Sequence, residues 1–253
     1  MITDIVLFLV GILIGLVNAV AAGGMLLGFP ALLAAGLPPI TANVTGKLVV
    51  FPSQLASAFG RREIFKQLPK RYLWLLLPLA AGTIAGAVIL RTTPSSQFEA
   101  IVPWLVLAAT IAFALQPVLK RRINAAARRK AVLPLAVLGL ILLILSVYAG
   151  YFGAGFGFML LALAGFSKLK NIRQMNAFKN LAGSISALVA LIALASNGFF
   201  AWQAGLSMAA GSIIGGYLGA RYDQKIPENL IRPFIIILGL ITTIILAFRF
   251  RYH

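Results

Sequence analysis

Residues 18–48 read NAVAAGGMLLGFPALLAAGLPPITANVTGKL, and a related pattern returns 133 positions later in residues 151–181, which read YFGAGFGFMLLALAGFSKLKNIRQMNAFKNL. Each copy contains a Gly-rich break inside an apolar run, a second short apolar run, a loop, and a helix that opens with Asn and Lys. Segments interrupted by Gly or Pro at corresponding places in two halves of a chain are typical of transporter binding sites. The repeat therefore predicts a duplicated membrane protein whose breaks lie near a binding site.

The composition is that of an integral membrane protein. Of the 253 residues, 61% are hydrophobic and 11% are charged, whereas soluble domains average about 45–50% and about 25%. We expect an all-α fold built from the apolar segments 5–21, 25–35, 41–60, 72–90, 98–119, 131–148, 150–166, 174–195, 202–220 and 233–248. Segments 25–35 and 150–166 are short and Gly-broken, so they either cross the bilayer or form half-helices that leave about eight full spans.

The positions of the cations predict the orientation. The net charge is +17, and 17 of the 22 Lys and Arg residues fall in four clusters between apolar segments, at 61–71, 120–130, 168–173 and 221–232. When the segments alternate across a bilayer, all four clusters fall on one side, which the positive-inside rule makes the cytoplasm. This pattern argues against a nucleic-acid partner and favours a bacterial cytoplasmic (inner) membrane with the basic loops inside.

The segments divide into two repeats. Residues 1–119 form an N-terminal repeat, 120–130 a basic cytoplasmic linker, and 131–253 a C-terminal repeat. An odd number of segments in each half inverts the second half relative to the first, as in many secondary transporters. Glycines at four-residue spacing, which let helices approach closely, occur in both halves: Gly82 and Gly86, and Gly211, Gly215 and Gly219.

Two lysines, Lys47 and Lys179, lie inside apolar segments, one in each half. Asn43 shares a helix face with Lys47, and Asn176 with Lys179, since residues three or four apart are neighbours. A Lys at the centre of a span costs about 2.5–3.5 kcal/mol and normally faces a cavity or a partner; the alternative is that both snorkel to the headgroups. All five acidic residues lie at segment ends or in loops. We therefore expect a shared site in which an anionic substrate is the counter-ion.

The Gly-rich breaks form the second part of the predicted site. Gly23, Gly24, Gly155 and Gly157 would let backbone amides approach a ligand, and each following half-helix would direct its positive dipole end toward it. Close helix packing explains the same glycines. No cofactor or metal is expected, because the chain has no Cys and its single His is the last residue. The lack of a His, Cys or acid in the core also disfavours an intramembrane enzyme.

The two-copy pattern resembles that of the sulfite exporter (TauE/SafE) family. The matching pieces are AAGGMLLGFPALLAAGLPPITANVTGK and GAGFGFMLLALAGFSKLKNIRQMNAFKNL, with the Gly-spaced helices behind them. The second copy departs from the first in lacking a Pro at the place of Pro30 and in having Met175 where the first has Ala42. The resemblance implies secondary transport of sulfite, thiosulfate or small organosulfonates.

The expected function is thus a secondary transporter that moves such an anion across the lipid bilayer by alternating access, as a monomer or as a homo-oligomer. Two alternatives stay open. The chain could transport another small anion, or it could be a non-transporting membrane subunit or scaffold in which the lysines snorkel and the glycines only pack.

Overall fold

The computed structural model describes residues 2–20, 23–60, 62–65, 68–118, 132–169, 172–195, 198–222 and 228–251. We call residues 2–118 the first half and residues 132–251 the second half; the predicted linker at 120–130 lies outside the described residues. The first half forms α1 (Ile2–Val20), α2 (Met25–Ala34), α3 (Pro39–Phe59), α4 (Arg62–Phe65), the 3-10 helix η1 (Lys70–Leu75), α5 (Leu76–Thr92) and α6 (Ser95–Ala114). The second half forms α8 (Leu135–Tyr151), α9 (Phe156–Gly165), α10 (Ile172–Leu194), α11 (Trp202–Arg221) and α12 (Glu228–Arg251).

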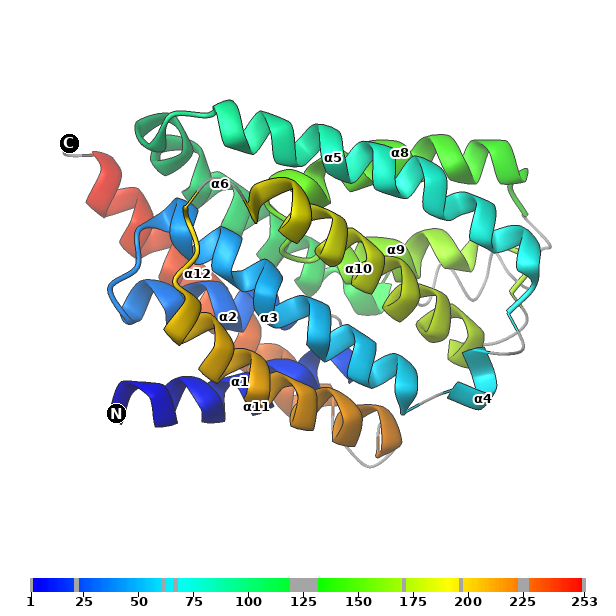
Figure 1. Ribbon diagram of the computed structural model, residues 1–253, viewed down its shortest axis with the longest axis horizontal. Helices are drawn as coiled ribbons and strands as arrows, with labels where there is room; N and C mark the ends of the chain where they lie inside the picture. Colours follow the sequence, from blue (N-terminus) through cyan, green and yellow to red (C-terminus); the bar gives the residue numbers. More distant parts are fainter. Residues whose placement is uncertain are drawn as a thin grey trace.

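These helices make a single bundle with no strand in the described ranges (Figure 1), as predicted. Among the described residues, five helices are long and apolar enough to cross a membrane: Thr3–Val20, Lys70–Thr92, Ser95–Ala114, Ile172–Leu194 and Arg232–Phe250. The helices α3 and α11, of 21 and 20 residues, are long enough but more polar. The fold is that of an all-α integral membrane protein.

The short segments α2 and α9 are half-helices. Each has 10 residues, or about 15 Å at 1.5 Å per residue, which is about half of a hydrocarbon core of roughly 30 Å. One predicted boundary is wrong: α8 runs through Gly150 to Tyr151, and α9 begins only at Phe156. The break between them contains Gly153 and Gly155 with φ of 87° and 77°, a left-handed backbone that glycine adopts without steric cost.

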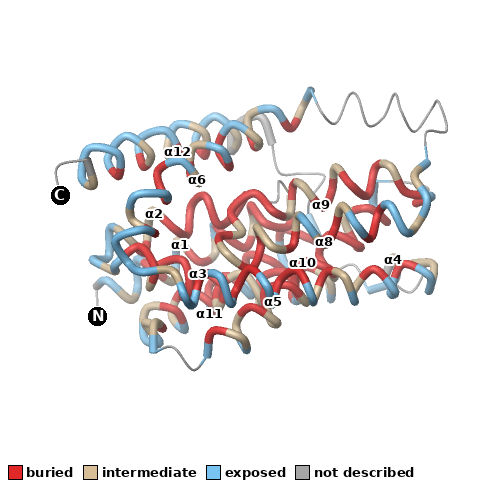
Figure 2. Tube along the Cα trace, turned by 90° about the horizontal axis from the view of Figure 1, so that it is seen from above, coloured by how far each residue is buried: buried red, intermediate tan, exposed pale blue. Residues whose placement is uncertain are grey.

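Each half packs its first helix against the other half, an arrangement that we call exchanged packing. The first helix of each half lies along the third long helix of the other: α1 along α11, and α8 along α5. The central helices α3 and α10 pack against each other, and so do α6 and α12. Figure 2 shows the buried residues gathered along the inner helices, while α12 is exposed along much of its length.

The Gly-spaced helices make the close contacts that their sequence predicts. A Cβ on Gly86 of α5 would overlap the carbonyl oxygen of Val147 on α8. A Cβ on Gly215 of α11 would likewise overlap the carbonyl oxygen of Ile12 on α1. The glycines therefore allow backbone-to-backbone approach in both exchanged pairs.

The ends of the bundle differ in charge. Figure 1 shows α4, the starts of η1 and α8, and the end of α11 at one end, and these flank the basic clusters. The start of α1, the end of α12, and the turn between α5 and α6 lie at the other end. The described parts of the basic clusters thus gather at one end of the molecule, as the alternation of segments predicts.

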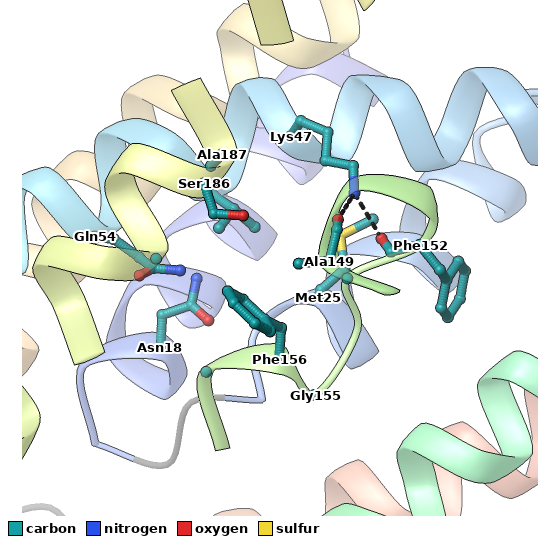
Figure 3. Close-up of a pocket in the computed structure, with 14 residues that line it drawn as sticks. Asn18, Met25, Lys47, Gln54, Ala149, Phe152, Gly155, Phe156, Ser186 and Ala187 are labelled. Atoms are coloured by element: carbon teal, nitrogen blue, oxygen red, sulfur yellow. Dashed lines mark hydrogen bonds between the residues drawn. The ribbon is translucent and has the colours of Figure 1, made fainter. Parts of the chain in front are cut away.

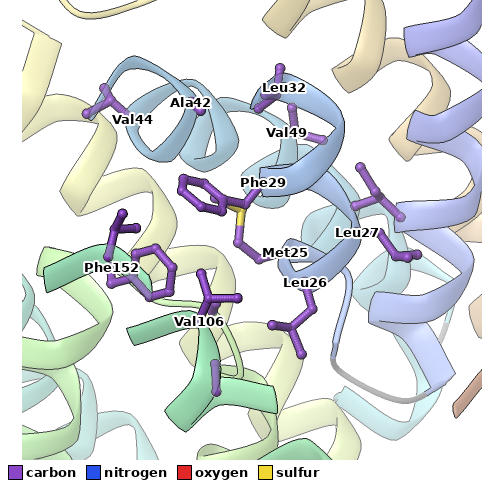
Figure 4. Close-up of a cluster of buried hydrophobic side chains, with 14 of the residues drawn as sticks. Met25, Leu26, Leu27, Phe29, Leu32, Ala42, Val44, Val49, Val106 and Phe152 are labelled. Atoms are coloured by element: carbon purple, nitrogen blue, oxygen red, sulfur yellow. The ribbon is translucent and has the colours of Figure 1, made fainter. Parts of the chain in front are cut away.

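An apolar cluster fixes the half-helix α2 against both halves (Figure 4). Phe29 of α2 meets Phe152, the first residue of the α8–α9 break, edge to face with ring centroids 5.4 Å apart. Val106 of α6 and Val49 of α3 are buried in the same cluster. Phe152 therefore anchors the break of the second half on the half-helix of the first.

Candidate functional site

A cavity of about 40 Å³ lies beside the α8–α9 break, between α3 and α10 (Figure 3). This volume is enough for water-sized groups. Its polar lining comes from Asn18 of α1, Lys47 and Gln54 of α3, and Ser186 of α10; Met25, Val50, Phe152 and Phe156 supply much of the apolar lining. Of the predicted site residues, Lys47, Gly155 and Gly157 line this cavity.

Lys47 is 6% exposed, so it does not snorkel. Its Nζ donates to the carbonyl oxygens of Ala149 at 2.6 Å and Phe152 at 2.8 Å. Carbonyls at the end of a helix lack intrahelical partners and attract cations. A Cβ at Gly153 would lie 3.0 Å from the Lys47 Nζ, so glycine also leaves room for the ammonium. An ammonium has three N–H donors; within the described part of the chain two are used, and one remains for a ligand.

Asn43 acts on the same helix end as Lys47. Its Nδ2 donates to the carbonyl oxygen of Tyr151 at 2.8 Å, and its side chain is fully buried. The buried Asn43 Oδ1 has no hydrogen-bond partner among the described residues. The shared face predicted for Asn43 and Lys47 is confirmed, but Asn43 holds the end of α8 from outside the cavity lining.

Lys179, in the second half, makes the equivalent contact with the first half. Its Nζ donates to the carbonyl oxygen of Asn18, near the end of α1, at 3.0 Å, and its side chain is 1% exposed. Asn18 and Tyr151 correspond at the offset of 133 residues. Each half therefore reaches across to the end of the other half's first helix. Asn176 is partly buried, and neither it nor Lys179 lines the cavity.

The two Gly-rich breaks differ in their surroundings. Gly155 and Gly157 flank the first residue of α9 and line the cavity. Gly23 and Gly24 are not among its lining residues. A Cβ on Gly23 would come within 2.6 Å of the Phe113 ring, and one on Gly24 within 2.5 Å of the Asn18 Oδ1. In this structure Gly23 and Gly24 are packed by neighbours, whereas Gly155 and Gly157 open onto the cavity.

Sequence reasoning missed Asn18, Gln54 and Ser186 as lining residues. Asn18 accepts the Gly24 N–H at 2.9 Å through its Oδ1 and donates to the Ser53 Oγ at 3.3 Å through its Nδ2. Ser186 shares a hydrogen bond of 3.0 Å with Thr83 of α5. These polar groups come from three helices, so their meeting depends on how the helices cross.

Gln54 is the one missed residue that the sequence could have revealed. It follows Lys47 by seven residues, or about two helical turns, which places both on one face. Gln54 is 8% exposed, and its Oε1 has no partner among the described residues. The side chain lies over Gly183 of α10, where a Cβ would overlap the Gln54 Oε1. Gly183 thus makes room for Gln54 at the cavity wall.

The chemistry of the cavity suits a small anion. It offers one buried ammonium, carboxamide and hydroxyl groups, and the N-terminal end of α9, which carries partial positive charge. No acidic residue occurs among the described residues that line it. The part of the chain that the structure describes also contains no group of three His, Cys, Asp or Glu side chains that could hold a metal ion.

A bilayer-sized helical bundle with two broken helices and a buried polar cavity defines the class as an integral membrane transporter. The family model described as "Sulfite exporter TauE/SafE" matches residues 7–246, and the chain belongs to this family. The resemblance deduced from the two-copy pattern is confirmed. No solved structure matches the chain significantly.

Curated relatives carry the same class name. The chain is similar to the "Probable membrane transporter protein ORF9" of Sinorhizobium sp, with 30% identity over 92% of this chain and 88% of the relative. It is 32% identical to the "Probable membrane transporter protein" of Haemophilus influenzae over 94% of this chain and 92% of that protein. It is 31% identical to the "Probable membrane transporter protein YfcA" of Escherichia coli K12 over 92% and 86%, respectively. The chain is thus a membrane transporter and not an enzyme.

Proposed function

We propose that this protein is a secondary transporter of small sulfur-containing anions, such as sulfite, thiosulfate or organosulfonates, and that the anion binds in the cavity beside Lys47. The observation that carries this proposal is the buried Lys47 Nζ, which makes two hydrogen bonds to carbonyl oxygens at the wall of a cavity whose described lining has no acid. As an ammonium it has a third N–H for the anion. An oxoanion accepts hydrogen bonds through several oxygens, so it can use Lys47, the Gln54 amide and the Ser186 hydroxyl together.

Charge complementarity explains the preference for an anion over a neutral solute. Charges interact more strongly in a protein interior than in water. The Lys47 ammonium and the start of α9 both favour negative charge at the cavity. The helix-end carbonyls of Ala149 and Phe152 balance Lys47 when the cavity holds no anion. A bound anion would then accept a hydrogen bond from the third N–H. After the anion is released, Lys47 still has its two carbonyl partners.

The packing of each half's first helix against the other half supports alternating access by two inverted repeats. The α5–α6 turn of the first half and the end of α11 in the second are corresponding points, and they lie at opposite ends of the bundle (Figure 1). This arrangement supports inversion. In the proposed second state, the surroundings of the two breaks are exchanged. Gly23, Gly24 and Lys179 would then stand toward the ligand where Gly155, Gly157 and Lys47 stand here. Asn176 would take the place of Asn43 beside them.

Uptake into proteoliposomes tests the proposal. Purified protein is reconstituted and offered sulfite, thiosulfate, sulfoacetate and a carboxylate control. We expect uptake of at least one sulfur anion above the carboxylate, a loss in Lys47→Met, and no loss in the matched variant Lys70→Met, since Lys70 is exposed. Equal uptake of the carboxylate would point to another anion class. No uptake of any anion by folded wild-type protein would favour the scaffold alternative.

A further inference from the structure

A second basic site lies far from the transport cavity, at the end of the bundle where η1 and α8 begin. A pocket of about 120 Å³ is lined there by Arg71, Tyr72 and Lys168 together with Leu133, Leu135 and Leu138. The Tyr72 hydroxyl accepts the backbone N–H of Lys168 at 2.7 Å, and the Arg71 guanidinium lies 5.4 Å from the Tyr72 ring centroid. Tyr72 thus holds two cationic residues at one pocket, and no acid occurs among its described lining residues.

An apolar groove continues from this pocket along the outside of the bundle. The groove, of about 540 Å³, is lined by Trp74, Pro78, Leu135, Gly139, Leu140 and Leu143, from η1, α5 and α8. Leu135 lines both the pocket and the groove. Trp74 is 69% exposed and Leu140 is 60% exposed, as expected of side chains that face lipid. Trp is also enriched where a membrane meets water.

We propose that this composite surface binds an anionic phospholipid, with the phosphate at Arg71 and Lys168 and an acyl chain in the groove. Basic pockets between helices at the membrane surface recognise anionic headgroups. The continuity of the cationic pocket with an apolar groove selects an amphiphile: a free phosphate would use only the pocket. A second copy of the chain packed in the groove would leave the two cations without an anion. The proposal is independent of what the protein transports.

The experiment measures lipid binding to the full-length protein in a neutral detergent. Native mass spectrometry and thermal shift are recorded with phosphatidylglycerol, with phosphatidylcholine of the same chains, and with inorganic phosphate. We expect phosphatidylglycerol to be retained and to raise the melting temperature, with the other two ligands weaker. The double variant Arg71→Gln/Lys168→Gln should weaken phosphatidylglycerol binding by about twenty-five-fold, since each cation contributes roughly fivefold near an anionic lipid.

Groove variants and a matched control complete the test. Gly139→Leu should fill the groove and weaken phosphatidylglycerol binding; Gly139→Ala serves if that variant does not fold, because its Cβ would lie 3.6 Å from the side chains of Leu75 and Pro78. Arg221→Gln, an exposed cation on α11, should change nothing. Equal binding of inorganic phosphate, or of phosphatidylcholine, would overturn the proposal. So would a dimer in wild-type protein that Gly139→Leu abolishes. The outcome of the lipid-binding experiment does not depend on which solute the protein transports.

Discussion

The Nζ of Lys47 lies 2.6 Å from the carbonyl oxygen of Ala149, so a cation from the third helix of the first half closes the end of the first helix of the second half. The reverse contact exists between Lys179 and the carbonyl oxygen of Asn18. Each intramembrane lysine therefore joins the two halves. Lys47 also lines the cavity, so its structural role and its proposed binding role are separable only by measuring both.

Lys47→Met tests these two roles together. Loss of its charge-assisted hydrogen bonds should lower the free energy of unfolding by about 1.5–3 kcal/mol. Anion affinity should fall by roughly ten- to a hundred-fold, since a charge-assisted bond to the ligand is of the same strength. Thermal unfolding in detergent and calorimetry with the transported anion provide the two readouts. Unchanged affinity in a folded Lys47→Met protein would place the anion elsewhere.

Lys179→Met separates structure from binding. Lys179 lies outside the cavity lining but holds the end of α1. We expect a loss of stability similar to that of Lys47→Met, with a smaller loss of affinity. If Lys179→Met lowers the anion affinity as much as Lys47→Met does, both lysines contact the substrate in the state that binds it.

Gly183→Ala should reshape the cavity through Gln54. The added methyl group would overlap the Gln54 Oε1, and the flexible end of this side chain can move away. We expect nearly unchanged stability and slower uptake. The double variant Gly183→Ala/Gln54→Ala removes the clash and reports the effect of losing the amide. Identical uptake in Gly183→Ala and wild type would show that Gln54 has no role in the substrate path.

Gly86→Ala should destabilise the exchanged packing. A Cβ there would overlap the carbonyl oxygen of Val147, and backbone atoms cannot move aside as a flexible side chain can. Overpacking of this kind costs about 1–3 kcal/mol or more. Thermal unfolding measures the loss, and Gly139→Ala is the matched control, because its Cβ would make ordinary contacts at 3.6 Å with the side chains of Leu75 and Pro78. A melting temperature equal to that of the control would contradict close packing of α5 on α8.

Asn180→Leu should raise stability while slowing transport. Asn180 is fully buried, and neither of its amide atoms has a partner among the described residues. An unsatisfied buried polar group costs about 1–3 kcal/mol, so an apolar side chain of similar size relieves that cost. Uptake should fall because Asn180 occupies the position that corresponds to Lys47 at the offset of 133 residues. Lower stability in this variant would show that the amide is satisfied by water.

Inversion of the repeats predicts a labelling pattern. The chain has no Cys, so single cysteines can be introduced and tested for labelling from outside intact cells. Ser95→Cys and Gln203→Cys should react from outside, whereas Arg62→Cys and Arg221→Cys should react only after permeabilisation. Labelling of Ser95→Cys and Arg221→Cys from the same side would leave a parallel duplication.

The helical class and the two short Gly-broken helices were predictable from the sequence because apolar length and Gly-rich breaks are local signals. The start of α9 was not. Gly150 looked like part of the break, yet a Cβ on it would overlap the carbonyl oxygen of Thr83 on α5. It is a packing glycine inside α8, and only a neighbouring helix distinguishes the two uses.

The site was partly predictable for the same reason. Lys47 was found because a charge inside an apolar segment is conspicuous. Its partners were missed because they are backbone carbonyl groups, such as that of Ala149, which every residue has and which no sequence pattern singles out. Asn18 and Ser186 were missed because the crossing of α1, α3 and α10 brings them together. Gln54, two turns after Lys47, was within reach of helical periodicity.

The pairing of α1 with α11 has a consequence for the synthesis and membrane insertion of the protein. Gly11 and Gly15 of α1 would overlap the carbonyl oxygens of Met208 and Ser212 if they carried a Cβ, so the glycine face of α1 is shaped for a helix that begins only at Trp202. A ribosome adding about 5–20 residues per second needs roughly 10–40 s to make the intervening chain. Throughout that interval α1 is in the membrane without α11. Its glycine face must then be exposed to lipid or covered by the insertion machinery.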